Sequence, residues 1–274
     1  MSFKRIRKLD KQTVEVETEF IDKYIEYINE NSIKEVQINS SYYFDDTLSF
    51  LTKCPQITHV YIVDSVIKDY SALYSLTELK CLSSQSPIIN LDFSLLCDLE
   101  ELSIIWNKSI KNLDSCKKIK YLNVSKFNPA NGNLTSLSIS LKIETLILNQ
   151  TSVTSLQGIE KLSKLKILHI NYAKKLKNFI GIEALATSLE QLDLYACRGV
   201  ESYKALGEAS SLKKLIIDKC NAIGKLFFLD ELKNLEWFVC MDTPFANEYL
   251  PEFDRMIYVY IENNKECIFK KDNR

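Results

Sequence analysis

The residues that could act as nucleophiles, bases or metal ligands are few and far apart. The chain of 274 residues has eight cysteines and only two histidines, and no two cysteines form a CxxC pair. A cysteine nucleophile needs a base beside it, and zinc sites use closely spaced Cys and His pairs. His59 and His169 are widely separated, and neither has an evident cysteine neighbour. The pattern therefore predicts a non-enzymatic chain with no metal site and no cofactor.

Other chemically capable groups have ordinary interpretations. The paired carboxylates Asp45-Asp46 and Glu100-Glu101 are typical of solvated turns and strand edges. The six glycines form no GxGxxG or GxxxxGK[ST], so the common phosphate-binding loops are absent. Lys and Arg number 35 while Asp and Glu number 36, a net charge of −1. This balance gives no reason to expect binding to nucleic acid or to an anionic membrane.

The sequence also bears on location and on redox state. It has no stretch of about 18 apolar residues that could span a bilayer. The basic N-terminal residues are not followed by the apolar segment of a secretory signal. Eight cysteines in a chain of this length do not indicate a disulfide scaffold. We therefore expect a cytoplasmic protein with reduced, mostly buried thiols.

An internal repeat sets the elements that must position any functional residue. The phrase L-x-x-L-x-L, with other apolar residues in some Leu slots, recurs eleven times at intervals of 19 to 24 residues. Its L-x-L part predicts a short strand, and the period of three that follows predicts a short helix or 3₁₀ segment on the return path. The middle apolar residues are Val36, Val60, Leu79, Leu102, Leu122, Leu146, Leu168, Leu192, Leu215, Phe238 and Val259.

Three kinds of position around this phrase carry structural predictions. The residue five after the middle one is mostly Ser, Thr, Asn or Cys, as expected for a side chain that bonds the backbone of a tight turn. The residue two before it alternates in charge from Glu100 to Glu236, which predicts cross-strand ion pairs. The cysteines occupy such structural places, namely Cys197 and Cys220 at the turn position, Cys81 and Cys240 in the third apolar slot, and Cys97 and Cys116 on the apolar return path.

With this repeat the chain resembles the bacterial leucine-rich-repeat proteins, and its unit of about 22 residues is similar to the internalin type. The resemblance covers about residues 33–264. It implies an α/β leucine-rich-repeat solenoid of about eleven units, with a curved parallel sheet on the concave side and short helical or 3₁₀ segments on the convex side. We expect one domain over 1–274, with an N-terminal cap over 10–32, repeats over 33–264 and a closing segment over 265–274.

The concave face carries the candidate binding residues. Side chains on either side of the middle apolar residue, and the two after the strand, should point to this face. Aromatic rings that project from a sheet toward solvent indicate binding, because they give large, rigid contacts at low entropic cost. The competing interpretation is that the rings only pack on one another along the sheet. The candidates are Tyr61, Trp106, Tyr121, His169, Tyr172, Asp193, Tyr195, Asp218, Trp237, Asp242, Tyr258 and Tyr260, with Glu262 adding a further charge.

Two functional hypotheses follow, and both describe a protein-binding module rather than an enzyme. The acidic and aromatic C-terminal half favours a protein partner with a basic surface. The ending YLPEFDRMIYVYIENNKECIF resembles the last unit of small bacterial leucine-rich-repeat proteins that are encoded beside toxins. This resemblance implies an immunity protein that neutralises a cognate bacterial toxin. The alternative is a secreted or host-directed adhesin or effector of the internalin type. The repeat itself indicates fold and not activity.

Overall fold

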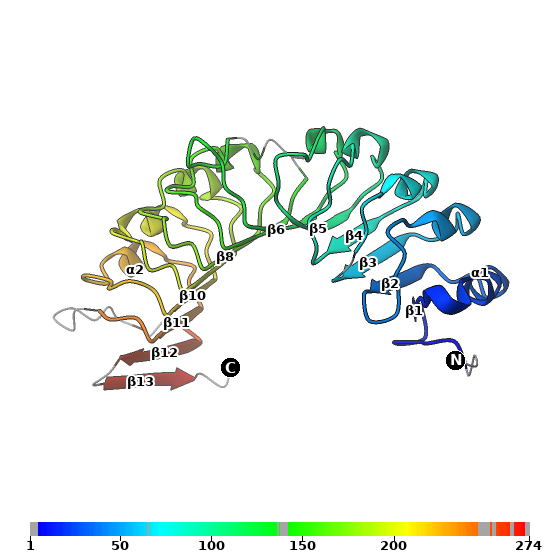
Figure 1. Ribbon diagram of the computed structural model, residues 1–274. Helices are drawn as coiled ribbons and strands as arrows, with labels where there is room; N and C mark the ends of the chain where they lie inside the picture. Colours follow the sequence, from blue (N-terminus) through cyan, green and yellow to red (C-terminus); the bar gives the residue numbers. More distant parts are fainter. Residues whose placement is uncertain are drawn as a thin grey trace. The chain divides into compact units, whose positions relative to one another are not determined.

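The computed structural model describes residues 5–64, 66–135, 137, 142–245, 253, 256–263 and 266–271 (Figure 1). Contacts within the chain divide it into two compact units, residues 1–122 and 123–274, and each is described by itself. Strand β6 (Tyr121–Ser125) contributes residues to both units. The expected single domain over 1–274 stays a prediction.

Unit 1 alternates short strands with short helical turns after an N-terminal cap. The cap consists of β1, η1 and the amphipathic helix α1, which buries Tyr24 and Ile28 and so covers the end of the core. The elements are β1 (Thr13–Glu15), η1 (Thr18–Phe20), α1 (Ile21–Glu30), β2 (Glu35–Asn39), η2 (Ser49–Lys53), β3 (His59–Val63), η3 (Ser71–Ser75), β4 (Cys81–Ser84), η4 (Phe93–Leu95), β5 (Glu101–Ile105) and η5 (Leu113–Ser115), where η denotes a 3₁₀ helix.

Unit 2 continues the same alternation and ends in a hairpin. Its last strand, β13, pairs antiparallel with β12 and occupies the expected closing segment. The elements are β7 (Thr145–Asn149), η6 (Ile159–Lys161), β8 (Ile167–Asn171), η7 (Ile182–Leu185), β9 (Gln191–Tyr195), η8 (Lys204–Glu208), β10 (Lys214–Asp218), α2 (Phe228–Glu231), β11 (Trp237–Met241), β12 (Tyr258–Asn263) and β13 (Glu266–Lys271).

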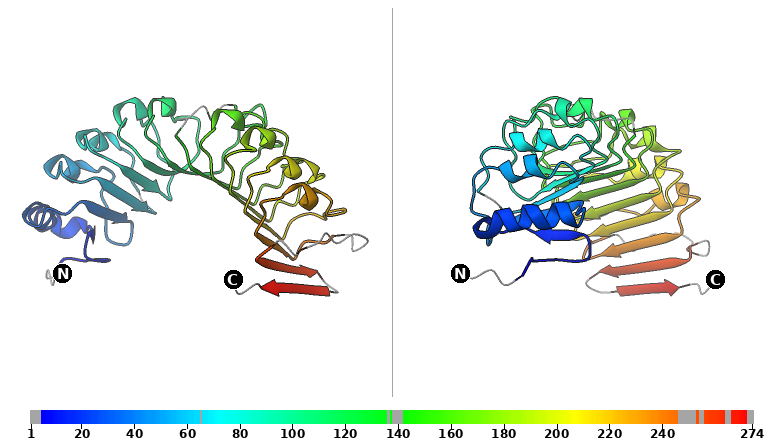
Figure 2. Two further views of the ribbon diagram at one scale, coloured as in Figure 1. Left: turned by 180° about the vertical axis from the view of Figure 1, so that it is seen from behind. Right: turned by 90° about the vertical axis from the view of Figure 1, so that its right-hand side faces the viewer.

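The sheet has the topology that a leucine-rich repeat requires. Strand order is sequence order, and the strands are parallel from β1 to β5 in unit 1 and from β7 to β12 in unit 2. Within each unit the helical turns lie on one side of the strands (Figure 2). We call the opposite side of the strands the open face. The prediction of a leucine-rich-repeat solenoid of roughly eleven units is confirmed.

The core is a column of aligned apolar side chains. Leu146, Leu168, Leu192 and Leu215 are direct partners across β7 to β10, and all four are fully buried. Burying a leucine contributes about 1.5–3 kcal/mol, so each turn of the chain is held mainly by this column and the return-path residues that pack on it. Because side chains alternate along a strand, the same registration places the residues beside them on the open face.

One phrase of the repeat lies three residues away from its predicted position. Val60 pairs with Leu82, and Leu82 pairs with Leu102, so the middle residue of β4 is Leu82 and not Leu79. Apolar residues stand at positions 76, 79 and 82, and a period of three alone does not separate the return path from the strand entry. Corrected in this way, the intervals from Val36 onward range from 20 to 24 residues.

The predicted position is confirmed for Cys197, Cys220, Cys116 and Cys240 and is wrong for Cys81 and Cys97. Because Leu82 is the middle residue of β4, Cys81 lies on the open face and not in the third apolar slot. Cys197 Sγ donates to the carbonyl of Ile170 over 3.2 Å, as the turn position requires, and Cys116 and Cys240 are buried in the core. Cys97 is exposed, contrary to the prediction that it lies in the core. The apolar residues of that return path stand at 93, 96 and 99, and residue 97 falls outside this period.

The predicted charge ladder is present along the strand entries. In unit 1, Lys120 Nζ lies 3.2 Å from a carboxylate oxygen of Glu100. The register correction brings Lys80 into the same series, 3.9 Å from Glu100. In unit 2, Lys213 pairs with Glu190 over 3.1 Å. These side chains are partly exposed, so each pair contributes roughly 0.2–1 kcal/mol.

Candidate functional site

The open face of unit 1 buries its candidate side chains against one another. Tyr61 is half-buried, and its hydroxyl donates to Glu35 over 3.5 Å. Tyr121 is half-buried and lies close enough to Glu101 to be affected by its charge. Burial, with a contribution from nearby acidic groups, raises the pKa of both tyrosines. Cys81 lies among these residues and is only 5% exposed. These phenols therefore present little free polar surface.

The register correction places a thiol beside a histidine on this face. Cys81 is the direct cross-strand partner of His59, which the sequence interpretation did not foresee. A catalytic thiol needs a lowered pKa, because the thiolate is the nucleophile. Burial, and then the charge of Glu101, instead raise the pKa of Cys81 to about 12. His59 Nδ1 lies 2.8 Å from the Thr58 hydroxyl. The pair does not have the electrostatics of a Cys-His nucleophile.

The cap strand completes the polar bonding of the unit 1 open face. Glu15 is 3% exposed, yet it accepts from Arg7 Nε at 2.9 Å, Gln37 Nε2 at 3.1 Å and Asn39 Nδ2 at 3.2 Å. A buried carboxylate with several donors is satisfied within the fold. The polar groups around Glu15 are thus bonded to one another within unit 1.

The first strands of unit 2 are also bonded internally. His169 Nε2 lies 3.2 Å from a carboxylate oxygen of Asp193, and Gln191 Nε2 donates to both oxygens of that carboxylate at 3.1 and 3.0 Å. Alongside, Asn171 Nδ2 donates to Asn149 Oδ1 over 2.8 Å. These bonds fix the side chains in place and hold the surface in one arrangement.

A second cluster surrounds the ends of β8 to β10. The rings of Tyr172 and Tyr195 meet edge to face with centroids 5.1 Å apart. The ammonium of Lys219 lies 5.1 Å from the Tyr195 ring centroid and donates to its hydroxyl over 3.3 Å. This hydrogen bond, and then neighbouring acidic groups, raise the pKa of Lys219. Tyr172 stays 47% exposed, so it is available for contact.

Asp218 differs from the other carboxylates of the open face. Its Oδ1 is buried and has no hydrogen-bond partner, the one such side-chain atom among the described residues. Burial raises the pKa of Asp218, and the charge of Asp242 raises it further, although Lys219 opposes both. An unsatisfied buried acceptor costs free energy of folding.

The last strands form an aromatic and aliphatic surface, which we call the C-terminal patch. Trp237 and Tyr258 stack with ring centroids 4.7 Å apart and an interplanar angle of 18°. Trp237 nevertheless remains 40% exposed. Tyr260 donates its hydroxyl to Glu262 over 2.6 Å. Strand pairing sets the members side by side, and they are Ile216, Trp237, Val239, Met241, Tyr258 and Tyr260.

Three of these members were missed by the sequence interpretation. Ile216, Val239 and Met241 are half-buried on the open face, for which the prediction named only aromatic and polar residues. The signal was available, because β11 is apolar at all five positions and β10 at its three central positions, instead of alternating. Continuous apolar strands on a sheet with one uncovered face indicate a contact surface.

The predicted candidates do not form one cluster. Tyr61, Trp106 and Tyr121 belong to unit 1, and the other nine belong to unit 2. Trp237, Tyr172 and Asp242 are exposed, whereas the remaining nine candidates are half-buried: Tyr61, Trp106, Tyr121, His169, Asp193, Tyr195, Asp218, Tyr258 and Tyr260. Within unit 2, Asp193 and Tyr260 stand in one row through Ile216 and Val239.

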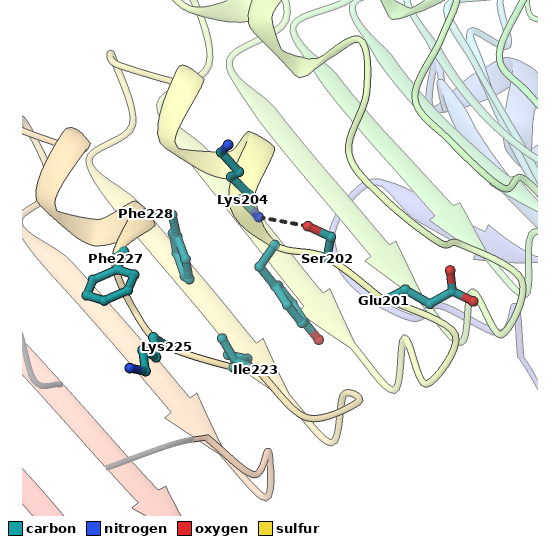
Figure 3. A pocket seen from close by; sticks show the side chains of 9 residues that line it. Glu201, Ser202, Lys204, Ile223, Lys225, Phe227 and Phe228 are labelled. Atoms are coloured by element: carbon teal, nitrogen blue, oxygen red, sulfur yellow. Dashed lines mark hydrogen bonds between the residues drawn. The ribbon is translucent and has the colours of Figure 1, made fainter. Parts of the chain in front are cut away.

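A separate hollow of about 400 Å³ lies outside the open face of unit 2 (Figure 3). Its lining comes from the return segments around η8 and α2. The residues are Glu201, Ser202, Tyr203, Lys204, Ile223, Gly224, Lys225, Phe227 and Phe228.

Among the described residues, no group of three or more His, Cys, Asp and Glu side chains could hold a metal ion. None of the described helices is long and apolar enough to cross a bilayer.

Comparison with known proteins supports the fold. No family model matches the sequence. Three solved structures are similar: internalin InlF of Listeria monocytogenes (16% identity, 88% of this chain and 71% of that chain, TM-score 0.62), internalin C2 of the same species (23% identity, 73% and 87%, TM-score 0.50) and the leucine-rich-repeat protein LIC12759 of Leptospira interrogans (17% identity, 92% and 78%, TM-score 0.57). At these identities the likeness shows the fold alone.

A curated sequence is similar over a shorter stretch. The "Putative disease resistance protein At4g19050" of Arabidopsis thaliana is 28% identical over 159 residues, which are 56% of this chain and 13% of that protein. The chain thus has the leucine-rich-repeat fold that internalins share. Such solenoids present extended sheet surfaces that generally bind other proteins.

Proposed function

We propose that this chain is a non-enzymatic protein-binding module and that its recognition surface is the C-terminal patch. The observation that supports this proposal best is Trp237, which is held flat against Tyr258 and is still 40% exposed. A pre-positioned ring loses little conformational freedom when a partner covers it. Aromatic residues in such settings are common hot spots of protein interfaces.

The charges beside the patch favour a partner with a basic surface. Asp218, Asp242 and Glu262 stand at the carboxyl ends of β10 to β12, next to the apolar centre. A lysine or arginine of the partner would screen the repulsion between the carboxylates of Asp218 and Asp242.

We propose further that the partner is a bacterial toxin and that this chain is an immunity protein acting in the cytoplasm. The acidic border of the patch and the resemblance to small leucine-rich-repeat proteins encoded beside toxins support this choice. The alternative is a secreted or host-directed adhesin or effector of the internalin type, and the shared fold favours both equally.

The binding proposal is tested with three versions of the chain used as bait in lysate of the source cell. The versions are the wild type, Tyr61→Ala in unit 1 and Trp237→Ala in unit 2. We expect one protein that the first two recover in equal amount and the third does not, with affinities then measured on purified proteins. Equal recovery by all three versions would reject the C-terminal patch.

The immunity proposal needs a test of its own. The captured protein is expressed in a host cell with and without this chain, and growth is followed. An immunity protein restores growth, and its Trp237→Ala variant does not. A captured protein that leaves growth unaffected would reject the immunity proposal and leave the binding proposal standing.

A further inference from the structure

The hollow between η8 and α2 has an apolar floor, and the one hydroxyl in that floor is hydrogen-bonded within the fold. The rings of Tyr203 and Phe228 stack with centroids 6.4 Å apart. Tyr203 is 4% exposed, and its hydroxyl donates to the carbonyl of Asn221 over 2.9 Å. Because this phenol is satisfied from within, the floor offers only ring surface and the side chain of Ile223.

An exposed phenylalanine stands at the rim. Phe227 is 53% exposed. A second hollow of about 740 Å³ shares Ser202, Lys204, Phe227 and Phe228 with the first. Ile180, which lines the second hollow, is 57% exposed. Large apolar side chains gathered around a depression are a feature of surfaces that bind another molecule.

The charges around the first hollow are predominantly positive. Lys204 and Lys225 line it, and the ammonium of Lys225 lies 5.7 Å from the centroid of the Phe227 ring. The one acidic residue of the lining, Glu201, is paired with Lys177 over 2.5 Å. The first hollow therefore presents two lysines around apolar rings, whereas the lining of the second hollow adds Glu208 and Glu231.

Gly224 lines the hollow, and neither its backbone conformation nor its neighbours require a glycine there. A Cβ at this position would meet no atom within 4 Å, and its φ is not in the left-handed region. By contrast, a Cβ at Gly158 would lie 2.4 Å from a backbone nitrogen, so the fold requires that glycine. A larger side chain at position 224 is thus expected to fill the hollow and leave the fold intact.

From these features we propose that the hollow is a second protein-binding site, which takes an acidic segment of a partner. A large apolar side chain of that segment packs on Tyr203 and Phe228, and carboxylates on either side of it pair with Lys204 and Lys225. This site is distinct from the open face and does not depend on the proposed function of the C-terminal patch.

The test uses a fluorescein-labelled peptide with the central sequence Asp-Asp-Phe-Asp-Asp and measures its binding by fluorescence polarisation. Control peptides replace all four Asp by Lys, or the Phe by Ala. We expect binding of the first peptide only, weakened about tenfold or more by Gly224→Leu and by the double variant Lys204→Glu with Lys225→Glu. The matched control Lys233→Glu, an exposed lysine outside both hollows, should bind within about twofold of the wild type.

Several results would overturn the proposal. These are equal binding of the lysine peptide, no binding of the acidic peptide, or undiminished binding by Gly224→Leu. Loss of binding in Trp237→Ala would also overturn it, because the peptide would then lie on the open face. Circular dichroism checks that each variant is folded. If Gly224→Leu does not fold, Phe227→Ser takes its place as the variant that should weaken peptide binding.

Discussion

The open faces of the two units are built from equivalent strand positions but differ in how their polar groups are satisfied. In unit 1, Glu15 takes three donors from the same fold, and Cys81 is almost inaccessible beneath its neighbours. In the last strands of unit 2, Trp237 is 40% exposed and Asp218 Oδ1 has no partner. Unit 1 bonds the polar groups of its face with its own side chains, whereas unit 2 leaves ring surface exposed and one buried carboxylate oxygen without a partner.

This difference separates two interpretations of a row of aromatic residues. Rings that cover a sheet are expected to be at least half-buried and hydrogen-bonded within the fold, as Tyr61 is. Rings that await a partner are expected to be held in place and yet exposed, as Trp237 is. The same residue type therefore has a different role in the two units, and burial decides which.

The largest effects should be the same in both units, because the cores do not differ. Leu102 and Leu192 are fully buried middle residues, one in each unit. Leu102→Ala and Leu192→Ala should each lower the free energy of unfolding by about 2–5 kcal/mol. Chemical denaturation measures both, with Leu95→Ala, a 61% exposed leucine, as the control that changes stability by under about 0.5 kcal/mol. A loss below about 1 kcal/mol in either unit would contradict the shared core.

The two faces should respond in opposite ways to removal of a ring. Trp237→Ala is expected to weaken partner binding by about 2 kcal/mol or more, roughly thirtyfold, with little change in melting temperature. Tyr61→Ala should lower stability by about 1–2 kcal/mol and leave the affinity unchanged. Calorimetric titration and thermal melting of both variants make the comparison. If Trp237→Ala destabilises the fold and binds normally, its ring only covers the sheet.

Asp218→Asn should raise stability and lower affinity together. The folded-state pKa of Asp218 lies above its ordinary value near 3.8, so the folded state binds more protons between the two values. Stability then falls as pH rises through this window, and the variant loses that dependence. At neutral pH we expect Asp218→Asn to be more stable than the wild type, and this gain should vanish well below pH 3.8. The variant should associate with the partner more slowly, and its association rate should depend less on salt concentration. A destabilised variant at neutral pH would contradict this account.

The charge ladder should give the smallest effects, and equal ones in the two units. Lys120→Ala in unit 1 and Lys213→Ala in unit 2 each remove an exposed ion pair with Glu100 or Glu190. We expect losses of about 0.2–1 kcal/mol that shrink in 1 M salt. Urea denaturation at low and high salt measures them, and a loss that salt does not change would mean that packing of the lysine stem is responsible.

Most of the fold could be predicted because the repeat states the same pattern many times. Eleven phrases were found, and ten of them have the predicted middle residue in its place. The error at β4 arose where apolar residues at 76, 79 and 82 allow two registers, and only strand pairing selects Leu82. That error concealed the contact of Cys81 with His59. Cys97 is exposed because the buried position of that return path is residue 96, one residue before the predicted one.

The sequence could predict which side of the sheet each candidate residue lies on, but not which candidates are exposed to solvent. Strand alternation gives the side on which Tyr61 and Trp237 lie, since both flank a core residue. It does not tell which of them is covered, because burial depends on neighbours from other strands. Neither the unpaired oxygen of Asp218 nor the hollow beside Gly224 leaves any trace in a sequence pattern.

The central claim is that a partner covers Trp237 in unit 2 and leaves the unit 1 face alone. The chain has two tryptophans, Trp106 in unit 1 and Trp237 in unit 2, so each unit carries one natural reporter. Labelling this chain alone with 5-fluorotryptophan gives two fluorine NMR signals, which Trp106→Phe and Trp237→Phe assign. On addition of the partner, we predict that the Trp237 signal shifts and becomes protected from solvent, whereas the Trp106 signal stays in place. A shift of Trp106 alone, or of neither signal at saturating partner, would contradict the account.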